Sequence, residues 1–479
     1  MKPNMLLNED YHYKWGILQV LEYKKNDFYT LGQLMEVTGI SKYKISKYLE
    51  EIVDEFSDID IVVNISVEPG NIIVTKGLDN LILKKIRLYY LENSLNFQIL
   101  ESIFYEVTQS DEKLSKKLII GRNQLYKRIR EVNKFLDDVN LRIDNLKIVG
   151  AEQDIRSTFF SLYDEFYTGL KLPFNDDISK LVNKFVSGFS LMEKVNLPKT
   201  QEFKFSIYTG VAQIRIINNH FLSSSPIEIN FAEAKRYKDI LHFPLTASED
   251  EINDEISSLL YYSQVENFFG EVRWNKANSA DNDIMNLVEG ITGEFVANIK
   301  NKFEFINPME LETIQNSLSM VNQKWLYFHF KETTFISDNS FSYLQELYPE
   351  YDKLIREFFD RKDISKLFAT SDEEVNVYYS YIFILINNIP INQVGESVYI
   401  CVDFSKGTEY NKFIKNSIDS FRDLNIIFEE YVSKRTNLYV SDYVSDKLRC
   451  KQIIWKNPPG PSDWKELGDV LIGIKHGLI

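Results

Sequence analysis

The sequence predicts a multidomain, mainly α-helical protein that begins with two tandem winged helix-turn-helix motifs and ends in a small α/β domain. A length of 479 residues exceeds what one hydrophobic core usually supports. Apolar residues make up 44% of the chain, and the small number of Gly and Pro residues is typical of globular helical proteins. Two stretches near the N-terminus each place a turn before a helix rich in cations, whereas strand patterns return only near the C-terminus.

The first motif covers residues 30–49. Thr30 can cap a short helix, and Gly39 can supply the positive φ of a sharp turn. A second helix then buries an apolar face and leaves its lysines outside, which is the geometry of a helix that enters a DNA major groove. An ordinary αα-hairpin with a solvated lysine face is the alternative. The candidate DNA contacts are Ser41, Lys42, Tyr43, Lys44 and Lys47.

A β-hairpin is expected directly after this motif. Residues 61–67 and 71–75 are β-branched runs on either side of Glu68-Pro69-Gly70. In this position the hairpin would form the wing of a winged helix-turn-helix domain.

A second copy of the motif follows. We expect an amphipathic helix at 97–107, a helix capped by Asp111, a turn at Gly121, a helix from Arg122 towards Leu136, and a second wing within 141–150. Arg can hydrogen-bond guanine edges, while Asn and Gln can pair with adenine. The same side chains could instead cap the helix or contact phosphate only. The candidate DNA contacts here are Arg122, Asn123, Gln124, Lys127, Arg128 and Arg130.

The net charge of −15 is unevenly distributed. Residues 1–150 carry a net charge of −1, and the remaining residues carry −14. Because DNA affinity depends on the cations that reach the phosphates, a near-neutral N-terminal region is compatible with specific binding. The acidic remainder argues against broad coating of nucleic acid.

The rest of the chain divides into helical and α/β parts. Residues 155–390 contain repeated amphipathic helical runs that suit two bundles of roughly 110 residues, with a polar boundary at 275–283. From about 395 the pattern is a strand at 397–403, a helix at 409–424 and a strand at 425–429. The expected domains are 1–78, 79–152, 153–278, 279–392 and 393–479.

In this order the chain resembles the Mga/AtxA type of transcriptional regulator from low-GC Gram-positive bacteria. The resemblance implies that the helical modules are PRDs, regulatory domains phosphorylated on histidine by the sugar phosphotransferase system. In such domains the pattern Arg-Ile/Leu-x-x-Gly-His carries the phosphorylated histidine. Arg215-Ile216-x-x-Asn219-His220 resembles this pattern and maps the phosphosite onto His220. His329 is a possible second site, although its aromatic surroundings favour a hydrogen-bonded core histidine.

The resemblance also implies partners. These are double-stranded DNA, a phosphocarrier protein of the phosphotransferase system, and further copies of the chain in a homodimer or higher homo-oligomer. The implied function is a DNA-binding regulator, most simply an activator of transcription. The last domain resembles EIIB, whose phosphorylated Cys precedes a Gly-rich loop. Here Cys401 lies inside a strand, close to Asp403, so we expect a packed cysteine and a domain used for association.

Two other function classes were compared with this prediction. A PRD-type antiterminator, which binds RNA, begins with a small all-β domain, whereas this chain begins with helices. A phosphotransferase carrier or enzyme would need a phosphorylatable cysteine directly before a Gly-rich loop. We find no P-loop, Gly-x-Ser-x-Gly or His-Glu-x-x-His motif, and we expect no enzymatic activity, cofactor or metal. No apolar window approaches a membrane span, and neither a signal peptide nor a disulfide framework is indicated, so a cytoplasmic protein is expected.

Overall fold

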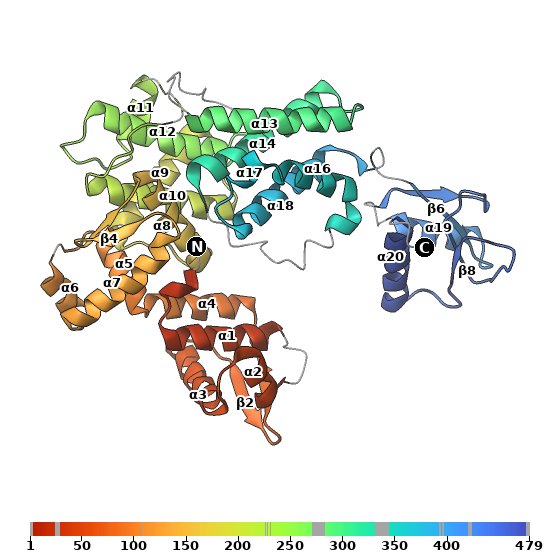
Figure 1. Cartoon of the computed structure of the whole chain (residues 1–479), viewed down its shortest axis with the longest axis horizontal. Coiled ribbons are helices and arrows are strands. Elements are labelled where there is room, and N and C mark those ends of the chain that lie inside the picture. Colours follow the sequence, from red (N-terminus) through yellow and green to blue (C-terminus); the bar gives the residue numbers. More distant parts are fainter. Residues whose placement is uncertain are drawn as a thin grey trace. The chain divides into compact units, whose positions relative to one another are not determined.

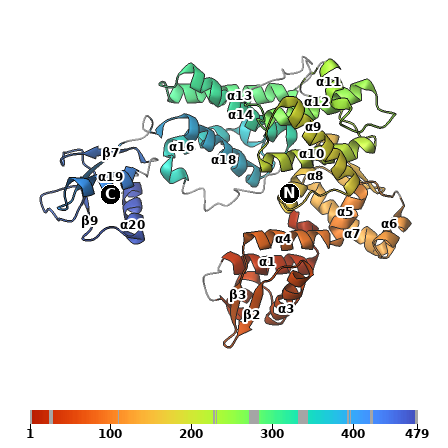
Figure 2. The ribbon, with the colours of Figure 1, turned by 180° about the vertical axis from the view of Figure 1, so that it is seen from behind.

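The computed structural model describes residues 3–23, 29–108, 110–225, 227, 229, 231–270, 283–330, 344–391, 394, 397–419 and 424–475. The chain divides into two compact units. The first comprises Met1–Asn282 with Leu326–Glu332, and the second comprises Asp283–Trp325 with Thr333–Ile479. Helices dominate both units (Figure 1; Figure 2). None of the helices in the described ranges is long and apolar enough to cross a membrane.

The first winged motif forms as predicted. Thr30 caps its first helix in a capping box with Gln33, Gly39 ends that helix at φ 69°, and the side chain of Ser41 caps the second helix. The three strands form an antiparallel sheet in the order β1-β3-β2. The elements are η1 (Pro3–Leu6), α1 (Glu9–Tyr23), β1 (Tyr29–Thr30), α2 (Leu31–Thr38), α3 (Lys42–Asp58), β2 (Asn64–Glu68) and β3 (Ile72–Lys76).

The second winged motif differs from the prediction at its turn. Gly121 has φ −75° and is the N-cap of the second helix, so the expectation that it makes the turn is wrong. Ile119 instead takes the left-handed conformation, with φ 55°. Ser110, rather than Asp111, is the N-cap of the first helix. The elements are α5 (Leu95–Phe104), α6 (Asp111–Lys117), α7 (Arg122–Asp137), β4 (Arg142–Asp144) and β5 (Lys147–Val149).

The helix α4 (Asn80–Glu92) lies within the expected second domain, 79–152, but no helix was predicted at this position. Asp79 caps it by accepting the backbone N–H of Ile82 at 2.9 Å. It packs against α1 and against α8 (Glu152–Tyr167). The helix therefore joins the first winged motif to the helical module that follows.

The helical module of the first unit packs around aromatic side chains. Its helices are α8, α9 (Asp176–Glu193), α10 (Lys199–Ile217), α11 (Phe231–Lys238) and α12 (Glu249–Val265). The rings of Tyr208 and Tyr262 stack with centroids 4.3 Å apart, and Phe205 stacks on Tyr262 at 5.8 Å. Phe328 adds its ring to this core, in edge contact with Tyr208 and Tyr262. These contacts fix the position of α10, which leads to His220.

The second unit begins with a helical module. Its helices are α13 (Asp283–Lys302), α14 (Pro308–Gln323), α16 (Pro349–Phe359), α17 (Lys362–Ser365) and α18 (Ser371–Asn388). The helix α14 ends at Gln323, where the π-helical turn η2 (Lys324–Phe328) follows. The predicted boundary at 275–283 lies outside the described residues except for Asp283. Tyr381 donates to the buried side chain of Asn322 at 2.8 Å within this module.

The second unit ends with a parallel sheet of four strands in the order β7-β6-β8-β9. The first strand, helix and second strand agree with the predicted pattern, although residues 420–423 of the expected helix lie outside the described residues. The elements are β6 (Val398–Asp403), α19 (Thr408–Asp419), β7 (Ile426–Glu429), β8 (Leu438–Ser441), β9 (Lys451–Ile454) and α20 (Pro461–Lys475).

Candidate nucleic-acid interface and histidine site

The predicted DNA contacts of the first motif lie on the solvent side of α3. The first four, Ser41 to Lys44, are exposed, and Tyr43 shows 80% of its surface. Lys44 Nζ lies 5.5 Å from the ring centre of Tyr13, and Lys47 pairs with Glu51 at 3.3 Å. Ile45, Tyr48, Leu49 and Ile52 are buried on the opposite face, as predicted. The helix therefore presents a cationic end while its apolar face anchors it.

The candidate contacts of the second motif occupy the start and outer face of α7. Arg122, Asn123 and Gln124 are exposed in its first turn. Arg122 lies 3.3 Å from Glu112 and Arg128 lies 2.7 Å from Glu131. The remaining two, Lys127 and Arg130, are exposed and have no ion-pair partner among the described residues. These two cations are the most readily available to phosphate.

His220 follows the end of α10 in a Schellman motif. Its backbone N–H donates to the carbonyl of Arg215 at 2.9 Å, and the N–H of Asn219 donates to Ile216 at 3.0 Å. Asn219 has φ 60°, a left-handed conformation, and it occupies the position of Gly in the PRD pattern Arg-Ile/Leu-x-x-Gly-His. Asn tolerates this conformation better than most residues. The substitution of Asn for Gly therefore preserves the turn that presents the histidine.

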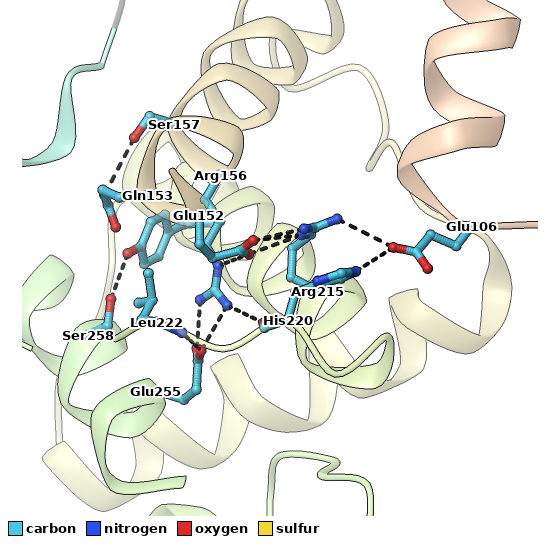
Figure 3. Close-up of polar contacts among 11 residues, drawn as sticks. Glu106, Glu152, Gln153, Arg156, Ser157, Arg215, His220, Leu222, Glu255 and Ser258 are labelled. Atoms are coloured by element: carbon cyan, nitrogen blue, oxygen red, sulfur yellow. Dashed lines mark hydrogen bonds and ion pairs between the residues drawn. The ribbon is translucent and has the colours of Figure 1, made fainter. Parts of the chain in front are cut away.

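An ion-pair network surrounds this turn (Figure 3). Arg215 donates three hydrogen bonds to Glu152, the shortest at 2.8 Å. Arg156 binds Glu255 through two hydrogen bonds of 2.6 and 2.8 Å and also donates to the carbonyl oxygen of His220 at 3.1 Å. Glu255 in turn accepts the N–H of the nearby Leu222 at 2.9 Å. The network thus holds the backbone at His220 and at Leu222.

The side chain of His220 contacts the second winged motif. Its Nε2 lies against a carboxylate oxygen of Glu106, a residue of the turn after α5 that has φ 51°. Nη1 of Arg215 lies 3.9 Å from the same oxygen. The His220 side chain is 35% exposed, so part of it is accessible from solvent. This contact is one of those that join the helical module to the second winged motif.

Electrostatics hold the buried part of the network in its charged form. Arg156 and Glu255 are 1% and 0% exposed. Burial lowers the pKa of Arg156, but the carboxylates of Glu255 and Glu152 outweigh burial and raise that pKa above its ordinary value. Two guanidinium groups, of Arg156 and Arg215, face the three carboxylates of Glu106, Glu152 and Glu255. A further negative charge at this site would therefore be resisted by Glu106 and attracted by Arg215.

The interpretation of His329 as a core histidine in a helix is wrong. His329 lies after η2 with φ 51°, and its side chain is 48% exposed. Its Nδ1 lies 3.1 Å from Asp154 Oδ1. The side chain of His329 is therefore accessible from solvent and is held by a carboxylate.

Cys401 is buried in β6, as expected. Burial, followed by the charge of Asp403, raises the pKa of its thiol. A raised pKa disfavours the thiolate that a phosphoryl acceptor needs. The structure thus agrees with a packing role for this cysteine.

Two comparisons with known proteins bear on these sites. Residues 79–163 match the family description of the Mga helix-turn-helix domain. A protein of Streptococcus pneumoniae serotype 4 (strain TIGR4), named "Putative trans-acting regulator", is 21% identical over an alignment of 487 positions, which covers 94% of this chain and 95% of that protein. The resemblance to Mga-type regulators is confirmed. The Mga match extends from the start of α4 into α8 and so includes Glu106, Glu152 and Arg156, the residues that bind the His220 turn.

Proposed function

We propose that this Mga-type regulator binds double-stranded DNA through α3 and α7 and activates transcription in the cytoplasm under the control of phosphorylation at His220. The contact between His220 and Glu106 is the observation that carries this proposal. It gives a modification in the helical module a direct physical route to the second winged motif.

The DNA-binding part of the proposal rests on exposed cations on the second helix of each of the two motifs. Each phosphate contact contributes about one unit to the slope of log affinity against log salt concentration. Lys44 and Lys47 would supply such contacts from α3, and Lys127 and Arg130 from α7. Arg122, Asn123 and Gln124 are the candidates for reading bases, because they occupy the first turn of α7.

Binding to promoter DNA at several salt concentrations tests this part. The double variants Lys44→Ala/Lys47→Ala and Lys127→Ala/Arg130→Ala should each lower the salt slope by about two units. A matched control is Lys180→Ala/Lys199→Ala, which removes two exposed cations from the helical module. An unchanged slope in either test pair would show that its motif does not contact DNA.

Phosphorylation would change the charge at the contact between module and winged motif. A phosphoryl group adds about −1.5 to −2 charges by analogy with other phosphoresidues. At His220 this charge would repel the carboxylate of Glu106 and attract Arg215, which lies 3.9 Å from that carboxylate. We expect the contact between His220 and Glu106 to open and the position of the second winged motif to change. In a dimer, this change would alter the spacing of the DNA-binding domains.

The phosphorylation test uses the general proteins of the phosphotransferase system and phosphoenolpyruvate. Acid-labile label should appear on the wild type and be lost in His220→Ala. Equal label on both proteins would exclude His220, and loss of label in His329→Ala would assign it to that residue. The absence of label on the wild type would contradict control by this system.

The C-terminal domain is proposed to be EIIB-like in fold and to mediate self-association. Its four-stranded parallel sheet supports this proposal. The loop after β6 is occupied by a carboxylate, since the backbone N–H of Ser405 donates to Asp442 at 2.8 Å. A phosphate in this loop would meet that negative charge. Association between copies of the chain, rather than phosphoryl transfer, is therefore the role that we propose.

A further inference from the structure

The second wing is held against α7 by one asparagine. The side chain of Asn133 accepts the backbone N–H of Ile143 through Oδ1 at 2.6 Å, and its Nδ2 donates to the carbonyl oxygen of the same residue at 3.1 Å. Ile143 stands opposite Ile148 in the pairing of β4 with β5. The two bonds to Asn133 therefore occupy the outer edge of β4, where a further strand would otherwise pair. The wing is thus joined directly to the helix that carries the candidate base contacts.

The turn of this wing is tight and is stabilised by burial. Asn145 and Leu146 have φ 47° and 56°, so the two residues between β4 and β5 have the positive φ values of a type I′ hairpin turn. A positive φ is costly for leucine, but only 5% of Leu146 is exposed. Leu141 and Ile143 are also buried. The conformation of the wing is therefore fixed in the free protein, and DNA binding would not have to order it.

The exposed strand positions of this wing carry two cations. Arg142 in β4 and Lys147 in β5 are exposed, and neither has an ion-pair partner among the described residues. Asp144 stands opposite Lys147 and is the one exposed carboxylate of the two strands. Arg130, which is exposed and also lacks an ion-pair partner in the described part of the chain, lies about one turn before Asn133 on α7. The wing thus adds two available cations to those of α7.

The first wing differs in the charge of its tip. Glu68 is exposed at the end of β2, directly before the turn that leads to β3. The one cation of residues 64–76 is Lys76, which stands opposite Asn64 at the other end of the hairpin. A carboxylate at the tip of a wing is repelled by phosphate. The first wing is therefore poorly suited to contact the DNA backbone.

The length of the second wing limits which part of DNA it can reach. Its strands have three residues each, so the hairpin extends by about 10 Å at about 3.3 Å per residue. A recognition helix lies in a major groove about 12 Å wide, with a phosphate backbone along each edge. A hairpin of about 10 Å beside α7 is long enough to reach that edge and too short to cross it into the minor groove.

We propose that the second wing is a phosphate clamp, in which Arg142 and Lys147 each contact one DNA phosphate and Asn133 positions them relative to α7. This role rests on the proposed DNA binding through α7. The contacts fix the register of α7 in the groove without reading bases, because phosphates carry no direct sequence information. The two motifs are therefore unequal. The second contacts phosphates from its helix and its wing, and the first from its helix alone.

Binding of the full chain to promoter DNA at several salt concentrations tests the clamp. Arg142→Ala/Lys147→Ala, which changes two exposed side chains, should lower the slope of log affinity against log salt concentration by about two units. The ranking of affinities for single-base variants of the site should not change. Lys76→Ala, the matched removal of an exposed cation from the first wing, should leave the slope unchanged. An unchanged slope in the double variant, or a lower slope in Lys76→Ala, would overturn the clamp.

Asn133→Ala tests the positioning role in the same assay. It should lower the slope by up to about two units in the wild type and cause no further loss in Arg142→Ala/Lys147→Ala, because the cations that Asn133 positions are then absent. An equal loss of affinity in both backgrounds would show that Asn133 acts only on the fold, and its positioning role would be overturned.

The variant Lys127→Ala/Arg130→Ala separates this clamp from DNA binding by α7. If that variant lowers the slope and Arg142→Ala/Lys147→Ala does not, α7 binds DNA without the wing and the clamp alone is overturned. If neither variant lowers the slope, the proposed DNA binding by α7 fails together with the clamp.

Discussion

The substitution Glu255→Gln removes the charge that holds the His220 turn. Glu255 is fully buried, accepts two hydrogen bonds from Arg156 and accepts a third from the N–H of Leu222. Removing one partner of a buried ion pair typically costs about 3–5 kcal/mol. Because Arg156 keeps Glu152 at 2.9 Å and the carbonyl of His220, we expect a cost near the lower end, about 3 kcal/mol.

Native-state hydrogen exchange measures this cost locally, which suits a chain with several domains. A loss of about 3 kcal/mol corresponds to about 100-fold faster exchange of the amides of His220 and Leu222. Asp250→Asn is the control, because it removes an exposed carboxylate from the same helix. If the two amides exchange at the wild-type rate in Glu255→Gln, the buried pair does not stabilise the turn and our reasoning is wrong.

Three further predictions concern stability and assembly. Burial, aided by the charge of Glu92, raises the pKa of Glu101 to about 7. The stabilisation that comes from this protonated carboxyl is complete below the ordinary glutamate pKa of 4.5 and is lost as pH rises through about 7. The free energy of unfolding, measured with urea, should therefore fall by at most about 3 kcal/mol over this pH range in the wild type, and Glu101→Gln should not show this fall. Asn219→Ala should cost about 1 kcal/mol in the same assay, whereas Asn219→Gly, which suits φ 60°, should be nearly neutral. Deleting residues 395–479 should shift sedimentation towards monomer, and an unchanged oligomer would exclude the C-terminal domain as the site of association.

Local signals predicted the first winged motif in detail. Thr30, Gly39 and Ser41 act through hydrogen bonds and backbone conformations that involve only neighbouring residues. The second motif was predicted with an error in its turn, where Ile119 takes a left-handed conformation that is costly for a β-branched residue. Sequence reasoning assigns such a position to Gly, so it selected Gly121.

The surroundings of His220 could not be predicted in the same way. The motif that ends at His220 and the turn at Asn219 are local, and they identified the histidine. Glu106 is 114 residues earlier in the chain, and no spacing in the sequence relates it to this turn. Arg215 binds Glu152, which is 63 residues earlier in the chain. Long-range packing of α8 and α10 brings these charges together, and packing of that kind has no sequence signal in a single chain.

The affinity of phosphorylated and unphosphorylated protein for the same promoter DNA tests the central claim most directly. Coupling between two sites is typically worth about 1–3 kcal/mol, so phosphorylation at His220 should change the dissociation constant by about 5- to 150-fold. In Glu106→Gln, which removes the repelled carboxylate, the change should be much smaller. Equal DNA affinity of the two wild-type forms, with His220 shown to carry the label, would contradict the account.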